Sequence, residues 1–524
     1  MTKYLISRIL RSLCSVIIVV AIVMLMIYSA LDRNLIFAQD SQYTKVQENA
    51  KKVYCMQQWE KYGYVDYVPY ADYMKDLLKA GDISQEDYSV AVKFGKTAEK
   101  DSELTAKYVQ QFKEWAEADG YEFVRLDAVE KRGRGLKAGG EPRIYAYKDI
   151  PVFMRLWNYF TGLIRVDNIH YVEEDIEDRG LTFTLHDPAY GGKKFAPAIM
   201  GNGTQHKYLL YFDGQFPYIH QNLVTINLGT SYSINQGVDV FETMTQSQGS
   251  LDFSMVTYPS GVVEKSADNV HSATYMPGSL EKGTLVIKKN YVDDYTNVRT
   301  NLDGMSTIGY SFTLGIIATF LSYLIAIPLG ITMALKKDKL VDKLGTLYIV
   351  FITAVPSLAY IFLFKSIGGK MGLPTSFNMT NPTWLMYILP IISLALPSIA
   401  SQMKWLRRYM IDQMSADYVK FARSGGLSEG EIFTKHILKN AIIPIVHGIP
   451  GSVLFALTGA IITERVYTVP GVGDLLTRAI SNYDNGVIVG MVLFYALLTV
   501  TSIILGDVLM SLLDPRISFT SKAR

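Results

Sequence analysis

The side chains that could carry chemistry in this chain do not form a recognisable catalytic set. His170, Glu173 and Glu174 have part of the spacing of a zinc motif, but the second histidine at helical spacing is missing. No G-x-x-x-x-G-K-[ST] phosphate-binding loop occurs in the 524 residues, so the chain should not hydrolyse nucleotide by itself. We therefore expect no catalytic residues, no metal site and no cofactor in this chain.

The overall charge and the cysteines set two further limits. The net charge is +2, which gives no field directed toward nucleic acid. Cys14 lies in an apolar segment and Cys55 in a polar one, so a disulfide within the polar region is impossible.

The most informative polar residues surround a glycine pair, Gly425-Gly426, between two hydrophobic segments. Apolar spacing predicts a short helix on each side, with Tyr418, Phe421 and Ala422 on one side of the first helix. The second arm, 429–440, carries an apolar stripe and returns toward the hydrophobic part; its members are Ile432, Phe433 and Ile437. Small residues at the turn allow another surface to approach the backbone. By shape alone, an ordinary loop and a segment gripped by another protein are equally good readings.

Six apolar segments are long enough to cross a hydrocarbon core, and the only Lys or Arg within them is Arg11, near the start of the first. They are Ile9–Leu31, Ile308–Leu335, Leu344–Phe364, Trp384–Met403, Ile442–Ile462 and Val487–Leu513. The first is longer than a signal-peptide core, so we expect a retained anchor. Asp507 is the one acid among them, and prolines interrupt several, as is frequent where helices line a path.

Basic residues alternate between the loops and predict the orientation. They are concentrated before the first span, after the second (336–343) and after the fourth (404–439). The positive-inside rule therefore places both termini and these loops in the cytoplasm. The polar, tyrosine-rich insertion, residues 32–305, then lies outside, between 1–31 and the membrane core 306–524.

The insertion should form its own α+β core. Helical periodicity is found at Lys45–Tyr62, Tyr70–Ala80, Gln85–Phe94 and Ser102–Asp119. Strand patterns are found at Tyr121–Leu126, Leu181–His186, Lys207–Phe212 and Thr284–Lys288. Pro151–Val166 reads as an aromatic helix suited to a membrane interface.

The segment 417–444, DYVKFARSGGLSEGEIFTKHILKNAIIP, closely resembles the cytoplasmic "EAA" loop of binding-protein-dependent ABC importers, in the version of the B-type oligopeptide and dipeptide permeases. Four other segments resemble the same family: the start YLISRIL, then NLGTS at 227–231, ERVYTVPGVGDLL at 464–476 and LLDPRI at 512–517. Gly425 replaces the usual lysine. The resemblance covers roughly 1–31, 227–245 and 305–518; the bulk of the outer insertion is an enlargement beyond it.

The resemblance implies an all-α polytopic membrane protein with six transmembrane helices and a type I ABC importer permease fold, carrying an inserted extracellular α+β domain. Its implied partners are a second permease, two ABC ATPases that bind ATP and Mg, an extracellular peptide-binding lipoprotein and membrane lipid. The coupling loop would be about 412–440. Its implied contact residues are Asp417, Tyr418, Ala422, Arg423, Gly425, Gly426, Leu427, Phe433, His436, Asn440 and Pro444.

A peptide path is expected beside the prolines of spans three to five, at Pro356, Ser357, Pro390, Pro397 and Pro450. The enlarged outer part most resembles permeases of Gram-positive peptide systems, which favours oligopeptides; dipeptides and nickel stay open. Two other classes of protein fit the sequence less well. A membrane sensor would need an output module, and an enzyme with an external active site would need a catalytic set, and the sequence shows neither.

Overall fold

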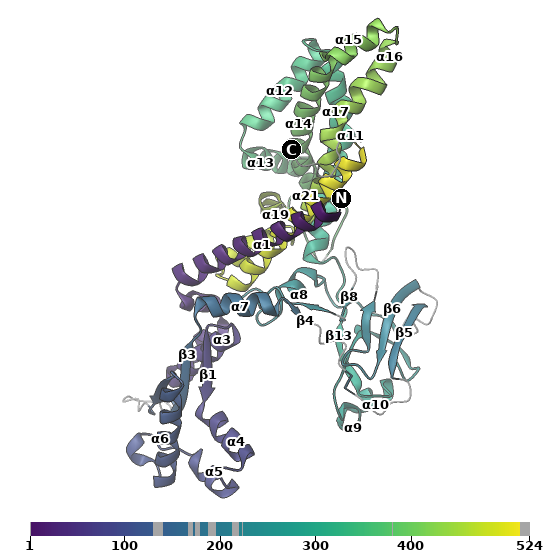
Figure 1. The fold of residues 1–524 in the computed structure, drawn as a ribbon. Helices are drawn as coiled ribbons and strands as arrows, with labels where there is room; N and C mark the ends of the chain where they lie inside the picture. The colour runs from purple at the N-terminus through teal and green to yellow at the C-terminus, as the bar shows by residue number, and fades with distance from the viewer. Residues whose placement is uncertain are drawn as a thin grey trace.

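A computed structural model describes residues 2–128, 140–165, 171–172, 179–186, 195–211, 220–222, 224–379, 381–458 and 460–513. A helical bundle forms one end of the molecule, and two lobes hang from the other end (Figure 1). The bundle's far end carries the predicted glycine bend and is called the bend end below; the opposite end is called the lobe end. The zinc-like residues His170, Glu173 and Glu174 and most of the LLDPRI segment lie outside the described residues.

The described residues contain five helices long and apolar enough to cross a membrane, or six spans if one bent pair counts as one. Four of the spans are single helices or nearly so: α1 (Thr2–Ala30), α11 (Thr307–Leu335), α14 (Leu385–Met414) and α21 (Asn485–Leu513). The fifth, Glu429–Thr458, runs through α16 (Glu429–Glu431), a π-helical segment (Ile432–Leu438), α17 (Lys439–His447), α18 (Ile449–Phe455) and a 3₁₀ turn (Ala456–Thr458).

The predicted third span, Leu344–Phe364, is broken at Pro356, one of the prolines that interrupt the apolar segments. The structure has α12 (Leu340–Ala354) and α13 (Ser357–Lys370), bent by 107°. Pro356 has no N–H to continue a helix and forces an extended backbone on the residue before it, Val355 (φ −84°, ψ 130°). The predicted fifth span also ends too late, because a new helix, α19, begins at Ile461.

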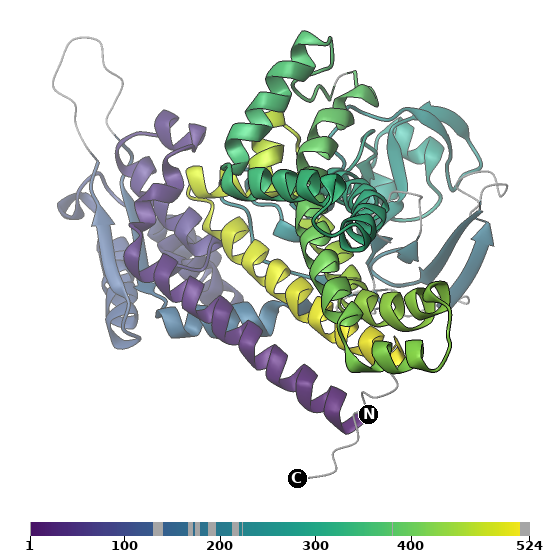
Figure 2. The same ribbon diagram turned by 90° about the horizontal axis from the view of Figure 1, so that it is seen from above.

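The spans pack in two groups. Helices α11 and α14 share a core of small and branched side chains that includes Ala318, Ala326 and Ala395, and small residues let membrane helices approach closely. Helices α1 and α21 pack together, running side by side in both ribbon views (Figure 2). Arg8 Nη1 lies 2.5 Å from Asp507 Oδ2, so the one acid of the six predicted apolar segments is paired with the predicted amino-terminal motif.

The first lobe, residues 33–149, confirms the four predicted helices. They are α3 (Glu48–Lys61), preceded by the short α2 (Ser41–Lys45), then α4 (Tyr70–Ala80), α5 (Gln85–Ala91) and α6 (Glu103–Ala118). Two 3₁₀ turns, Arg33–Phe37 and Ala98–Lys100, complete the helical elements. An antiparallel sheet of order β1-β3-β2 packs against them, built from β1 (Val65–Pro69), β2 (Glu122–Leu126) and β3 (Arg143–Asp149).

The second lobe is mostly antiparallel sheet. Its strands are β5 (Gly180–His186), β6 (Phe195–Asn202), β7 (Tyr208–Tyr211), β8 (His220–Gln221), β10 (Ser254–Thr257), β11 (Val263–Ser266), β12 (Asp268–Tyr275) and β13 (Tyr295–Thr300). The strand predicted at Thr284–Lys288 is wrong. Thr284 instead caps α10 (Leu285–Asn290), which follows α9 (Ser279–Lys282), and its hydroxyl accepts the N–H of Ile287.

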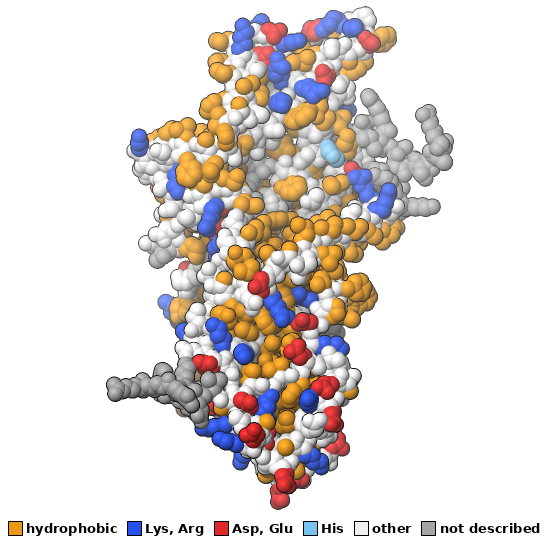
Figure 3. Space-filling view, turned by 90° about the vertical axis from the view of Figure 1, so that its left-hand side faces the viewer, with side chains coloured by type: hydrophobic (Ala, Val, Ile, Leu, Met, Phe, Trp, Pro, Cys, Tyr) orange, Lys and Arg blue, Asp and Glu red, His pale blue; other side chains and the backbone are white. Residues whose placement is uncertain are grey.

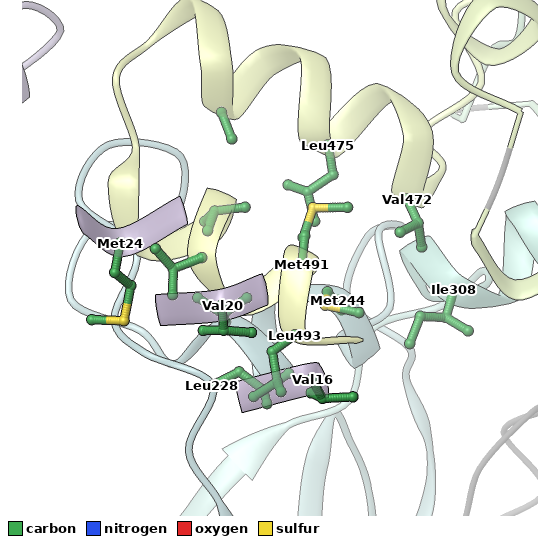
Figure 4. Close-up of a cluster of buried hydrophobic side chains, with 14 residues drawn as sticks. Val16, Val20, Met24, Leu228, Met244, Ile308, Val472, Leu475, Met491 and Leu493 are labelled. Atoms are coloured by element: carbon green, nitrogen blue, oxygen red, sulfur yellow. The ribbon is translucent and has the colours of Figure 1, made fainter. Parts of the chain in front are cut away.

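Helix α7 (Val152–Gly162) and a segment around 225–245 join the lobes to the bundle. This segment contains β9 (Thr225–Ile226), which pairs with β4 (Ile164–Arg165), and α8 (Val240–Thr245). Leu228 and Met244 pack with Val20 of α1 and Met491 of α21 in one buried cluster (Figure 4). The core of the bundle therefore continues into the segment that lies between the two halves of the second lobe.

Candidate functional site

The glycine bend closes a short helix, α15 (Asp417–Ser424), at the bend end. Gly426 has φ +84°; its N–H donates to the carbonyl of Arg423 at 3.1 Å, and the N–H of Leu427 donates to that of Ala422 at 3.3 Å. These are the two hydrogen bonds of a Schellman motif, which needs a left-handed residue at the position of Gly426. The predicted turn is confirmed. Nothing lies within 4 Å of the place where a Cβ on Gly426 would stand.

One face of the bend is buried against the bundle. Val419 (1 % exposed) and Ala422 pack with Ile432 and Ile437 of the second arm and with Met410 of α14. Phe433 packs at the edge of the same cluster, so the predicted stripe of the second arm is confirmed. Val419 was not among the predicted residues, and the signal that it faces inward is its three-residue spacing from Ala422, which is buried in the same cluster.

The opposite face of the bend is open. Phe421 is 81 % exposed, so it does not share the surroundings of Ala422, with which it was grouped. Leu427 and both glycines are also exposed, and Pro444 lies within α17. The bend therefore combines a buried base with an exposed apolar tip.

A polar contact clasps the two arms. The Tyr418 hydroxyl donates to the side chain of Gln413 at 2.5 Å and lies 3.3 Å from the carbonyl oxygen of His436. The amide of Asn440 donates to the same hydroxyl at 3.1 Å. Three of the predicted residues, Tyr418, His436 and Asn440, are thus brought together, and they fix the angle between the arms.

Exposed ion pairs span the turn. Arg423 donates to both oxygens of Glu429, at 2.6 and 3.0 Å, although both side chains are more than half exposed. Hydrogen bonding and charge from the guanidinium hold the pKa of the Glu429 carboxyl below its usual range. Asp417 pairs similarly with Lys420 at 2.9 Å. Such contacts in water contribute little to stability and exchange partners readily.

Residues 426–430 read G-L-S-E-G, which has the letters of the hydrolase nucleophile elbow. That elbow joins a strand to a helix, whereas this segment joins two helices. The Ser428 hydroxyl lies 2.9 Å from the Glu431 carboxylate in a capping box that starts α16. Ser428 is therefore a helix cap.

Charged side chains gather at the bend end, and broad hydrophobic surface lies below it (Figure 3).

A cavity of about 440 Å³ lies between α11, α14 and the α17–α18 arm. Most of its lining residues are small, and polar side chains alternate with apolar ones; they include Ser311, Ala318, Thr319, Leu394, Ser398, Gln402, Gly448, Gly451, Ser452, Phe455 and Ala456.

The five predicted path residues do not come together on this cavity. Pro356 and Ser357 form the bend between α12 and α13, Pro390 is buried within α14, and none of the five is among the lining residues. Ser398 and Gly451 do line it, and they directly follow Pro397 and Pro450. Small residues that follow two of the predicted prolines, rather than the prolines themselves, therefore form part of the cavity wall.

A buried carboxylate organises the lobe end of the bundle. Glu464, 1 % exposed on α19 (Ile461–Tyr467), accepts the N–H groups of Ala460, Gly473 and Asp474 and the hydroxyl of Ser311, at 2.8–3.1 Å. Burial raises the pKa of its carboxyl, even though these donors favour the charged form. A Cβ on Gly471 would stand 2.3 Å from the Glu464 carboxylate, so the P-G-V-G sequence before and within α20 (Val472–Ser481) lets backbone approach the acid.

A second buried carboxylate, that of Asp484, ties the segment 231–234 to the start of α21. It accepts the Ser231 hydroxyl at 2.7 Å and the N–H groups of Tyr232, Ser233 and Ile234 at 2.8–3.0 Å. A Cβ on Gly486 would stand 1.8 Å from the carbonyl oxygen of Thr230. The NLGTS segment is therefore a backbone-to-backbone docking strip, which its spacing alone could not reveal.

Comparison with known proteins gives consistent matches. The model of the family described as "binding-protein-dependent transport system inner membrane component" matches residues 326–519. The "Oligopeptide transport system permease protein AmiC" of Streptococcus pneumoniae is 35% identical over 528 residues, which covers 100% of this chain and 99% of that protein.

Two shorter matches each cover about two fifths of this chain. The "Dipeptide transport system permease protein DppB" of Bacillus subtilis is 28% identical over 213 residues, 40% of this chain and 68% of that protein. The "Metal-staphylopine import system permease protein CntB" of Staphylococcus aureus is 31% identical over 207 residues, 39% of this chain and 65% of that protein.

Proposed function

Because the chain belongs to the family of binding-protein-dependent transport permeases, with their type I ABC importer fold, we propose that it carries oligopeptides into the cell. It is a multi-pass membrane protein and a permease subunit of a peptide ABC importer; members of the family are transport subunits, not enzymes. The full-length relative's name supports oligopeptides. The names of the shorter matches, which mention dipeptide and metal-staphylopine transport, keep dipeptides and a metal such as nickel as second candidates.

The proposed topology has six spans, with the bent α12–α13 pair counted as one, and both termini in the cytoplasm. The basic residues of the bend end support it, since cytoplasmic loops are rich in Lys and Arg. Residues 32–305 then lie outside the cell. We propose that the cell is that of a Gram-positive bacterium. Peptide would be delivered there by an extracellular binding lipoprotein.

The bend at 417–444 is proposed to couple the permease to its ATPases. One observation carries this role: an exposed apolar tip at Phe421 and Leu427 stands on a base buried against α14. The same buried cluster includes Ala334 of α11, so a pull on the tip reaches both helices that line the cavity. ATP and Mg would be bound by two partner ATPases, and their closure would draw this bend toward that of a second permease.

Gly426→Arg tests the coupling role. Arginine at this position is strained, because L residues rarely adopt φ +84°, and its side chain fills the space that a partner surface would occupy. We expect uptake and substrate-stimulated ATP hydrolysis of the reconstituted transporter to be abolished, with normal amounts of protein in the membrane.

Two variants separate the contact from the turn. Gly372 has φ +82° and equally open surroundings, but lies in the loop after α13, toward the opposite membrane face; Gly372→Arg should transport normally. Gly426→Asn, which tolerates the left-handed conformation, should retain most activity. Full activity of Gly426→Arg would refute the coupling role.

The cavity between α11 and α14 is proposed as part of the peptide path, beside Pro397 and Pro450. Ser398→Trp places a large side chain in it, and uptake should stop while the subunits still co-purify. Ser401→Trp, at an exposed position one turn further along α14, is the matched control and should transport as the parent does.

A further inference from the structure

Helix α7 carries apolar side chains on two adjoining faces. Its inner face packs against the buried cluster of Figure 4 through Leu156, Tyr159 and Phe160. Its outer face consists of Phe153, Met154 and Trp157, which are 76, 48 and 60 % exposed. A helix that is apolar on most sides is normally covered on most sides, so the outer face needs a cover.

The position of α7 limits what that cover can be. The helix crosses the end of α1 where the chain leaves the bundle, between the two lobes (Figure 1). The Arg155 guanidinium lies 3.7 Å from the ring centroids of Tyr28 of α1 and of Tyr64 of the first lobe. This stacking places α7 at the level where the first span ends.

The outer face of α7 is continuous in character with the surface of that span. Ile18, Ile22 and Met26 of α1 are 58, 51 and 64 % exposed, as residues facing lipid must be in a structure without a membrane. Arg155 is the only charged residue of α7, and it is turned inward onto the tyrosines. No charge would therefore be desolvated if the outer face entered a bilayer.

We propose that α7 lies in the outer leaflet as an interfacial helix, with Phe153, Met154 and Trp157 inserted among the acyl chains just below the lipid headgroups. Amphipathic helices bind membranes at this depth, and tryptophan is enriched there. The inference rests on the proposed orientation of the chain and is independent of its cargo.

An interfacial α7 would set the position of both lobes. The N–H of Ile150, directly before the helix, donates to Tyr64 of the first lobe at 3.0 Å. Strand β4, directly after it, pairs with β9 on the way back from the second lobe. Both lobes would then be held at a fixed height above the membrane.

The test is quenching of a bimane label by brominated lipid. Cys14→Ala and Cys55→Ala remove the two native thiols, and Trp157→Cys, Met26→Cys or Leu285→Cys then adds one. The whole transporter, with its partner subunits, is placed in phosphatidylcholine nanodiscs brominated at a shallow or a deep acyl position. Met26 on α1 is the lipid control, and Leu285, 87 % exposed on α10, is the water control.

We expect the label at 157 to lose about half of its emission, more with shallow than with deep bromine, as a helix at the headgroup–acyl boundary requires. A label at 157 that matches the one at 285, while the one at 26 is quenched, would overturn the proposal and indicate a protein or solvent cover. A label at 26 that is not quenched would overturn the span assignment as well.

Discussion

The two ends of the bundle hold their carboxylates in opposite ways. At the lobe end, Glu464 and Asp484 are fully buried, and each accepts at least four hydrogen bonds, mostly from backbone N–H groups. At the bend end, Glu429 is 70 % exposed and is held by a single arginine. A buried, fully bonded carboxylate cannot change partners without a large cost, whereas an exposed pair can.

The difference suggests that the two ends have different mechanical roles. The lobe end fastens sequence-distant segments, 231–234 and 484–487, into one rigid junction. The bend end is rigid only at its buried base and keeps its charges and its apolar tip available. An importer moved by a separate motor needs both a fixed end and an end that can be gripped.

The largest effect should come from Asp484→Ala. The change leaves the N–H groups of Tyr232, Ser233 and Ile234 without their acceptor inside the protein. We expect the free energy of unfolding to fall by about 3 kcal/mol or more, visible as a lower thermal midpoint in detergent.

Glu429→Ala is the matched control for Asp484→Ala, because it removes an exposed carboxylate with one partner. Its thermal midpoint should stay at the parent value. Equal losses in the two variants would remove the distinction between the fixed end and the open end.

How far the sequence could predict these two ends follows from the range of the contacts. The bend was predictable because its glycine turn, its helix cap and its apolar stripe each depend on residues only a few positions apart in the sequence. The helices at 70–80 and 103–118 were predictable for the same reason, with Gly81 ending one and Ser102 capping the other.

The Asp484 junction was not predictable, because Ser231 is 253 residues away in sequence. The misassigned segment 284–288 is a local failure: its β-branched residues favour a strand, but the Thr284 cap starts a helix.

An intermediate effect, dependent on pH, is expected at Asp239, which caps α8 beside the fixed junction. One oxygen accepts the N–H of Phe241 at 2.7 Å, while the other is buried without a partner among the described residues. Burial raises the pKa of Asp239 to about 6. Because the folded state then binds more protons than the unfolded state, stability should fall as pH rises from about 4 to 6 and stay level above.

Asp239→Asn keeps a capping oxygen and removes the titration. At pH 7.5 the variant should be more stable than the parent by about 1 kcal/mol after allowance for solvent screening, and at pH 4.5 the gap should close. A stability difference between variant and parent that is the same at both pH values would show that burial does not raise the pKa of Asp239.

The smallest effect on stability, and the sharpest on function, is expected for the pair that bridges the bend. Arg423→Ala and Glu429→Ala break the same contact, and neither should move the thermal midpoint because both groups are in water. The lowered pKa of Glu429 stabilises the fold only above that pKa and is lost on acidification, so assays near pH 7 leave it fully ionised.

If Arg423 leaves Glu429 for an ATPase surface during transport, Arg423→Ala should lower peptide uptake severalfold, whereas Glu429→Ala should not. Lys420→Ala, which removes a similarly exposed cation on the same helix, controls for net charge. Equal loss of uptake in the Arg423 and Glu429 variants would mean that the contact between them matters as it stands. The bend would then be a fixed element like the lobe end, and the contrast between the two ends would fail.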